Sequence, residues 1–151
     1  MIYKKQLEQI WFLNKELEIW VKKKCEIDYG LKSPLTDIVN VQTSKQNKAE
    51  EQMLQRIKID EKIDSILDSI QKERIYVYET LEKINDSYLR MIIELRCVSL
   101  LPWDMVAKKI GFGNSESTKK TYHRAFEANG ELKKKYLKSN MSQMSQRDVL
   151  L

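Results

Sequence analysis

A short stretch of polar and basic side chains near residue 120 has the residue types that read nucleic acid. On a helix through 117–127, with about 100° between successive residues, Thr118, Tyr122 and Ala125 fall on one side. The opposite side carries polar groups, namely Glu116, Lys120, His123, Arg124 and Glu127, with Ser117 and Lys119 alongside. Hydrogen-bond donors near the N-terminus of a helix contact base edges in a DNA major groove, while Lys and Arg bind phosphates or guanine. The pattern predicts a surface for double-stranded DNA, and a plain solvated face is the alternative interpretation.

The lysine run 133–135 follows this helix and could add phosphate contacts, or it could be a solvated basic segment. The complete set of candidate DNA-binding residues is therefore Ser115, Glu116, Ser117, Lys119, Lys120, His123, Arg124, Lys133, Lys134 and Lys135.

The sequence offers few residues for catalysis, metal binding or cofactor binding. There is one histidine, the two cysteines Cys25 and Cys97 are far apart, and no Gly-rich phosphate loop is present. The carboxylates alternate with Lys and Arg at helical spacing, which is typical of solvated helix faces. We therefore expect no enzyme activity, no metal site and no cofactor. No apolar run approaches the ~20 residues that span a bilayer, and the first residues lack a signal-peptide core. We expect a soluble, reduced protein of the cytoplasm with no membrane partner.

The positive charge is concentrated in one segment. The 151 residues carry a net charge of +5. Residues 1–85 hold 15 basic and 15 acidic side chains, whereas residues 86–138 hold 11 basic and 6 acidic ones. A local basic excess attracts polyanions, and nucleic acid is the commonest of these in the cytosol.

The first part of the chain predicts two long helices. The sequence has only 4 Gly and 2 Pro, with 42% hydrophobic and 32% charged residues, which favours long helices in a folded chain. Apolar residues at steps of three and four predict helices over 4–28 and about 48–84, with a connector over about 30–47. The expected seam of the second helix is Ile63, Leu67, Ile70, Arg74, Val77, Leu81 and Ile84. We expect an antiparallel hairpin over residues 1–85. Its unused apolar seam favours a homo-oligomer, with a dimer preferred.

Three shorter helices are predicted over residues 86–138. Asp86 can cap the first helix, which runs through Arg96. Pro102 and Asp104 mark the start of a second helix, Trp103 to Ile110. After a turn at 111–114, Ser115 or Ser117 can cap a third helix over about 115–128, with Gly130 past its end. This is the helix-turn-helix plan. The expected fold is all-α: a long N-terminal helical hairpin, then a C-terminal helix-turn-helix domain. Residues 139–151 are expected to be a disordered tail.

Two runs in this region match a known pattern. YLRMIIELRC at 88–97 and PWDMVAKKIGF at 102–112 resemble the sigma-70 region 4 type of helix-turn-helix. Ser117-Thr118 and His123-Arg124-Ala125-Phe126 are similar to the ending of that pattern. With a helical N-terminal half, the layout is similar to phage and prophage transcriptional regulators of the RinA/ArpU type. The sequence departs from the pattern at Pro102, where a Ser or Thr cap is usual, and Asn114-Ser115 lengthens the turn by one residue.

This resemblance implies a bacteriophage or prophage protein in a bacterial host cell. It implies binding to promoter-proximal double-stranded DNA, activation of phage late genes and contact with RNA polymerase. A complete sigma factor is not expected, because the N-terminal half lacks the aromatic and basic helices that open a promoter. Two alternatives stay open at this point. One is the DNA-recognition small subunit of a phage terminase, and the other is a region 4-like module that binds RNA polymerase without reading DNA.

Overall fold

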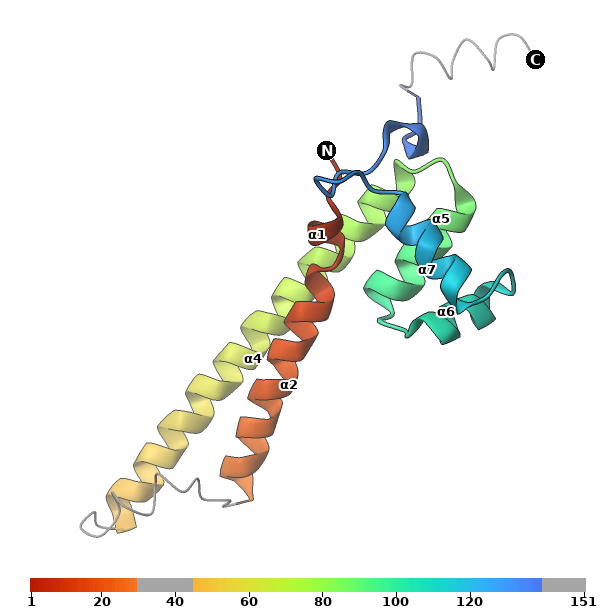
Figure 1. Cartoon of the computed structure of the whole chain (residues 1–151). Helices are drawn as coiled ribbons and strands as arrows, with labels where there is room; N and C mark the ends of the chain where they lie inside the picture. The colour runs from red at the N-terminus through yellow and green to blue at the C-terminus, as the bar shows by residue number, and fades with distance from the viewer. Residues whose placement is uncertain (30–44, 140–151) are drawn as a thin grey trace. The chain divides into compact units, whose positions relative to one another are not determined.

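The computed structural model describes residues 1–29 and 45–139, and these residues are predominantly helical (Figure 1). The expected all-α fold, with its helical hairpin and its C-terminal helical domain, is confirmed. The expected disordered tail lies almost entirely outside the described residues, as does most of the expected connector. In the described part of the chain, no helix is both long and apolar enough to cross a membrane.

The described chain forms two compact units. We call Phe12–Lys72 the hairpin unit, and we call Met1–Trp11 together with the residues from Glu73 onward the helix-turn-helix unit. This division differs from the expected boundary at residue 85. The first eleven residues and residues 73–85 group with the C-terminal helices, and both segments supply buried side chains: Ile2, Leu7 and Ile10 from the first, Val77 and Ile84 from the second.

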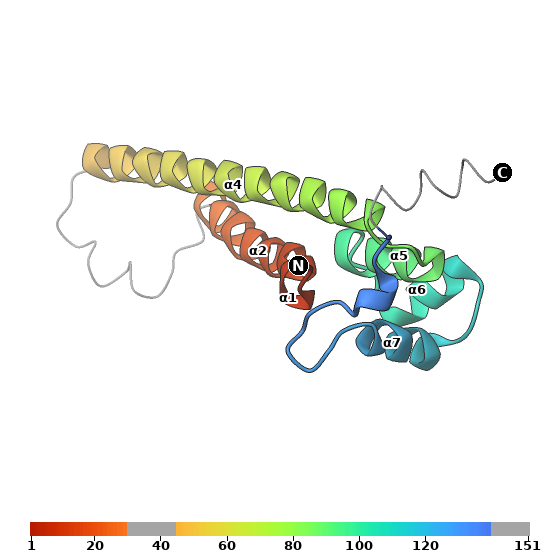
Figure 2. The same cartoon turned by 90° about the horizontal axis from the view of Figure 1, so that it is seen from above.

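The hairpin unit holds most of two long helices, α2 (Gln9–Asp28) and α4 (Lys45–Glu82), which lie side by side in both views (Figures 1 and 2). α4 begins at Lys45, a few residues earlier than expected. The helices are antiparallel, since the late residues of α2 pair with the early residues of α4. Three ion pairs join them: Asp28 Oδ1 to Arg56 Nε at 3.2 Å, Lys24 Nζ to Asp60 Oδ1 at 2.7 Å, and Glu16 Oε1 to Lys62 Nζ at 3.6 Å.

The buried stripe of α4 differs from the predicted seam. Within the hairpin unit its buried residues are Ile59, Ile66 and Ile70, whereas Leu67 is 47% exposed. Steps of four and seven residues in the observed stripe, and of three and four in the predicted seam, all return to one helix face, so periodicity alone does not separate the two. Ile70, Val77 and Ile84 of the predicted seam are buried, but Ile66 and Thr80 are buried in place of Leu67 and Leu81. The centre of the buried face therefore turns by about half of the ~100° step between neighbouring residues. This rotation also leaves Arg74 exposed, which avoids the cost of burying its charge.

The helix-turn-helix unit is built from short helices around a buried core. Its elements are α1 (Lys4–Leu7), the ends of α2 and α4, α5 (Ser87–Ile93), the π-helix η1 (Glu94–Val98), α6 (Trp103–Ile110), α7 (Ser115–Arg124) and the 3-10 helix η2 (Lys134–Tyr136). Figure 2 shows α5, α6 and α7 gathered together. Nearly inaccessible side chains form the core: Leu7, Ile10, Val77, Ile84, Leu89, Ile92, Ile93, Val106, Thr118 and Tyr122.

Local signals place the starts of these helices. Asp86 caps α5, because its Oδ1 accepts from the backbone amides of Tyr88 at 2.9 Å and Leu89 at 3.4 Å. This cap and the bounds of α6 confirm the prediction. The single helix predicted over residues 4–28 is wrong in one respect, since a break at Glu8 divides it into α1 and α2. The third short helix starts one residue after its cap, which is Asn114 and neither of the two serines.

α7 ends at Arg124, four residues before the predicted end. The chain then folds back: the Glu127 amide donates to the Glu131 carbonyl at 2.8 Å, and Phe126 forms an antiparallel bridge with Leu132. Beyond this, Tyr3 bridges to Glu131. These backbone bonds stop the helix because they need an extended chain where the sequence pattern alone allows another turn.

Candidate nucleic-acid interface

A tight turn joins α6 to α7. Gly111 and Gly113 have φ angles of +74° and +73°, which side-chain-bearing residues rarely adopt. Asn114 then forms a capping box with Ser117. Its Oδ1 accepts from the Ser117 amide at 2.8 Å, and the Asn114 amide donates to Ser117 Oγ at 3.0 Å. These reciprocal bonds fix where α7 starts and therefore which of its residues face outward.

α7 has one buried and one exposed side. Thr118 and Tyr122 are buried, at 0% and 1% exposed, and Ala125 follows as the buried C-cap residue. The exposed residues are Glu116, Ser117, Lys119, Lys120, His123 and Arg124, with Ser115 half-buried at the first position. The division matches the predicted helical wheel. A single helix therefore presents seven of the ten candidate residues together.

The three remaining candidates are elsewhere. The amide of Lys133 donates to the Ala125 carbonyl at 2.9 Å, so this residue lies beside the end of α7. Lys134 and Lys135 belong to η2, and the Lys135 carbonyl accepts from Asn85 Nδ2 at 2.9 Å. That contact ties η2 to the loop between α4 and α5. Lys133 therefore lies beside the end of α7, whereas Lys134 and Lys135 lie on a separate element, η2.

The charge on α7 is positive but partly neutralised. Lys119, Lys120 and Arg124 supply three cations, and Glu116 lies 4.0 Å from Lys120 in an exposed ion pair. An exposed pair of this kind contributes little to stability, and Lys120 stays available to an anion. Residues 1–11 and 73–139 carry fifteen basic and ten acidic side chains, so the net +5 of the chain belongs to this unit.

The N-terminal segment contacts the last turn of α7, which the sequence did not predict. Lys4 Nζ lies 2.8 Å from His123 Nδ1 and 5.5 Å from the centre of the Tyr122 ring. Tyr122 donates its hydroxyl hydrogen to Glu8 Oε1 at 2.9 Å. Lys4 and Glu8 are more than a hundred positions from α7, and nothing in their spacing links them to it. The apolar residues that predict the helix over 4–28 include Leu7, but they indicate only that one face of this segment is buried.

Burial and nearby charges perturb the ionisable groups of this cluster. Burial, and secondarily the ammonium groups of Lys4 and Lys119, hold the pKa of His123 below its usual value. Burial raises the pKa of the Tyr122 hydroxyl strongly, with neighbouring Cys97 and Glu8 adding to the effect. Burial also raises the pKa of the Cys97 thiol to about 12. At neutral pH, His123 and Tyr122 are neutral and Cys97 is a thiol.

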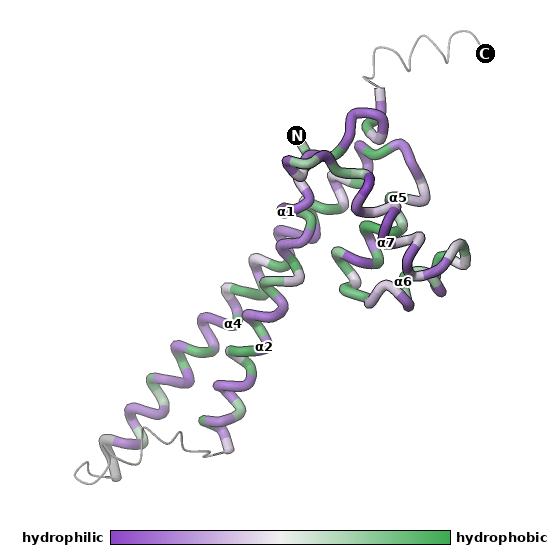
Figure 3. The backbone as a smooth tube through the Cα atoms, in the orientation of Figure 1, coloured by the Kyte–Doolittle hydropathy of each residue, from purple (hydrophilic) through white to green (hydrophobic). Residues whose placement is uncertain are grey.

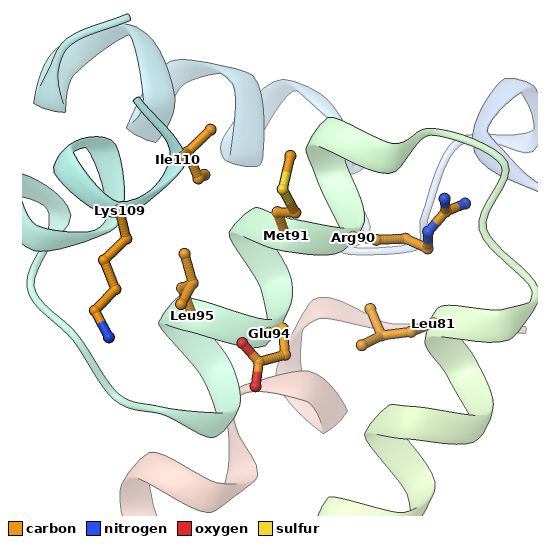
Figure 4. A pocket seen from close by; sticks show the side chains of 7 residues that line it. All are labelled: Leu81, Arg90, Met91, Glu94, Leu95, Lys109 and Ile110. Carbon is orange, nitrogen blue, oxygen red and sulfur yellow. The ribbon is translucent and has the colours of Figure 1, made fainter. Parts of the chain in front are cut away.

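Among the hollows that the described residues line, two lie beside these helices. One, of about 440 Å³, lies at the α6–α7 turn and is lined by Asp104, Ala107, Lys108, Gly111, Gly113, Asn114 and Ser115. The other, of about 500 Å³, has a mainly apolar lining from α4, α5, η1 and α6 (Figure 4). In Figure 4, Met91, Leu95 and Ile110 approach one another, with Glu94 and Lys109 at the border. The apolar hollow is formed without any residue of α7.

No group of three or more His, Cys, Asp or Glu side chains that could hold a metal occurs among the described residues. Comparison of the chain with known protein families, characterised proteins and solved structures finds no match.

Proposed function

We propose that this protein is a sequence-specific double-stranded DNA-binding regulator of transcription that places α7 in the major groove. The observation that carries the proposal is the division of α7. Thr118 and Tyr122 anchor it in the core, while the cationic and hydroxyl side chains on the other side are exposed. A helix presented in this way after a tight turn fits the groove. The resemblance to RinA/ArpU regulators favours activation of phage late genes in a bacterial cytoplasm.

The hairpin unit supports a second part of the proposal, that the protein acts as a homo-oligomer, with a dimer preferred. Three residues of this unit are buried among those described, while Met53, Leu54, Ile57 and Leu67 are each between 47% and 65% exposed. In a pair of helices, each helix buries only the face that contacts the other, so apolar residues on its other faces stay exposed. A second copy of the hairpin would cover them and would set the spacing of two DNA half-sites.

The DNA-binding test compares two double variants. Lys120→Ala with Arg124→Ala removes two cations from α7, and Lys22→Ala with Lys58→Ala removes two exposed cations from the hairpin unit. Footprints on DNA upstream of the neighbouring genes would be recorded at two salt concentrations. We expect the α7 variant to lose the protected site and the hairpin variant to keep it. Equal footprints for both variants, or only diffuse protection that salt removes from the wild type, would contradict the proposal.

The oligomeric state is tested by measuring the mass of the full chain in solution. We expect a dimer, and Leu67→Asp should shift the mass toward the monomer because it places a charge on the exposed apolar surface. A monomer at high protein concentration would contradict this part. A ring of eight or more subunits would instead favour the small subunit of a phage terminase.

The apolar hollow favours one alternative function, a protein-interaction module that binds RNA polymerase without reading DNA. Met91 is 43% exposed at this hollow, and Leu81, Leu95 and Ile110 line it. An apolar side chain of a partner could enter such a space. Retention of the wild type by RNA polymerase, lost in Met91→Lys and accompanied by no DNA footprint, would support this alternative.

A further inference from the structure

The contact between Lys4 and His123 defines which hydrogen-bonding group the end of α7 presents. Lys4 Nζ lies 2.8 Å from His123 Nδ1. A lysine ammonium has three donors and no acceptor, so Nδ1 must be the acceptor. A neutral imidazole that accepts at Nδ1 carries its hydrogen on Nε2. His123 is exposed, and it therefore offers one N–H donor and no free acceptor.

The backbone holds Lys4 in place for this contact. The Lys4 amide donates to the Gly130 carbonyl at 2.8 Å, and the Leu132 amide donates to the Ile2 carbonyl at 2.7 Å. Four residues further on, Glu8 accepts the hydroxyl hydrogen of Tyr122 at 2.9 Å. The N-terminal segment is thus fixed on both sides of Lys4, and the ammonium group is directed to the end of α7.

The groups around His123 favour its neutral form. Burial lowers the pKa of His123 most; the cations Lys4 of α1, Lys119 of α7 and Arg96 of η1 also lower it, and the carboxylate of Glu8 opposes them. The Trp103 ring of α6 lies 6.2 Å from the imidazole, centre to centre. Three cations disfavour a fourth positive charge at this position. The ring can then act as a neutral donor at neutral pH.

We propose that Lys4 is a positioning residue of the α7 surface, holding His123 as a neutral Nε2–H donor that reads an acceptor on DNA. This inference depends on the proposed DNA binding. In the major groove, the acceptors are N7 and O6 of guanine, N7 of adenine and O4 of thymine. The amino groups of cytosine and adenine are donors and are rejected at this position. A residue near the start of the chain therefore positions a base-reading side chain of α7.

The first test examines the tautomer directly, in the free full-length protein. Nitrogen-15 NMR of the imidazole at pH 7 should show an unprotonated Nδ1 and a protonated Nε2. Lys4→Met should give a mixture of tautomers and raise the pKa of His123, whereas Lys4→Arg, which keeps a donor, should restore the wild-type signals. Lys5→Met is the matched control, because Lys5 is the exposed neighbour with the same charge. A protonated Nδ1 in the wild type, or identical spectra for Lys4→Met and Lys5→Met, would overturn the inference.

The second test measures base preference by selecting binding sites from a pool of random duplexes. We expect Lys4→Met and His123→Gln to weaken the preference at one shared base position by on the order of tenfold. Lys5→Met should keep the preference. A wild type that selects a sequence but is unaffected by Lys4→Met would overturn the inference and leave the proposed function standing. A wild type that selects no sequence would overturn both the proposed function and the base-reading role, while the NMR result still decides the Lys4–His123 contact.

Discussion

The hairpin unit and the helix-turn-helix unit use their apolar residues in opposite ways. In the hairpin unit, Ile59, Ile66 and Ile70 are buried among the described residues, while several large side chains such as Met53 and Leu67 are exposed. The helix-turn-helix unit buries a core from α1, α4, α5, α6 and α7. The charges differ as well. Residues 12–72 carry eleven basic and eleven acidic side chains, whereas the other unit holds the entire excess of +5.

The difference separates two ways in which a sequence specifies structure. The hairpin unit depends on periodicity and on exposed ion pairs, each of which contributes little to stability. The helix-turn-helix unit depends on close packing, capping and positive-φ glycines, which tolerate fewer changes. We therefore expect similar substitutions to have large effects in one unit and small effects in the other.

The largest expected effect comes from shortening a leucine in the N-terminal segment. Leu7 is 0% exposed, so Leu7→Ala should lower the free energy of unfolding by about 2–5 kcal/mol. Leu67→Ala in the hairpin unit is the matched control, and on a surface position the change should be within about 0.5 kcal/mol. Urea unfolding followed by circular dichroism, at concentrations where the chain is monomeric, measures both. Equal losses would show that the two units do not differ in packing.

The two glycines of the α6–α7 turn give the next effect. Gly113→Ala places a Cβ 2.7 Å from Ser117 Oγ at a φ of +73°, so it strains the backbone and also disturbs the capping box. Gly111→Ala meets nothing within 4 Å at nearly the same φ. The strain should cost about 1–2 kcal/mol in each variant, and loss of the cap should add about 0.5–2 kcal/mol at Gly113 only. Thermal unfolding of the two variants tests this, and equal melting temperatures would contradict a role for the capping box.

The helix starts and the exposed face of α7 could be predicted from the sequence, because the residues that determine them lie close together in the chain. The Pro102–Asp104 start of α6, the Asp86 cap and the wheel of α7 depend on residues within a few positions of one another. The choice between Ile66 and Leu67 depends on the partner helix, and the end of α7 at Arg124 depends on the reversal at 126–132. The docking of Lys4 and Glu8 onto α7 joins segments more than a hundred residues apart. Periodicity and capping carry no information about such contacts.

A smaller effect is expected from pH. The pKa of His123 lies below its ordinary value of 6.5 because of burial and the nearby cations Lys4 and Lys119. The folded protein therefore binds fewer protons there than the unfolded chain, and stability rises with pH. The contribution of His123 is complete above about pH 6.5 and is lost as the pH falls through the lowered pKa of the folded state.

The measurement is the melting temperature between pH 5 and pH 8 for the wild type and His123→Gln. Glutamine does not titrate, so the wild type should lose more stability toward acid than this variant. Parallel pH profiles would show that His123 titrates alike in the folded and unfolded states.

Thiol labelling compares the two units directly, because each unit contains one cysteine. Cys25 of α2 is exposed in the hairpin unit, whereas Cys97 of η1 is buried and its Sγ lies 3.7 Å from the Tyr122 hydroxyl. Only a thiolate attacks a disulfide reagent, and burial raises the pKa of Cys97 to about 12. At pH 7.5 we expect Cys25 to be labelled rapidly and Cys97 only when the helix-turn-helix unit opens. Leu7→Ala should accelerate labelling of Cys97 and leave that of Cys25 unchanged. If both cysteines react at the same rate in the wild type, the tight packing assigned to the unit that carries α7 is wrong.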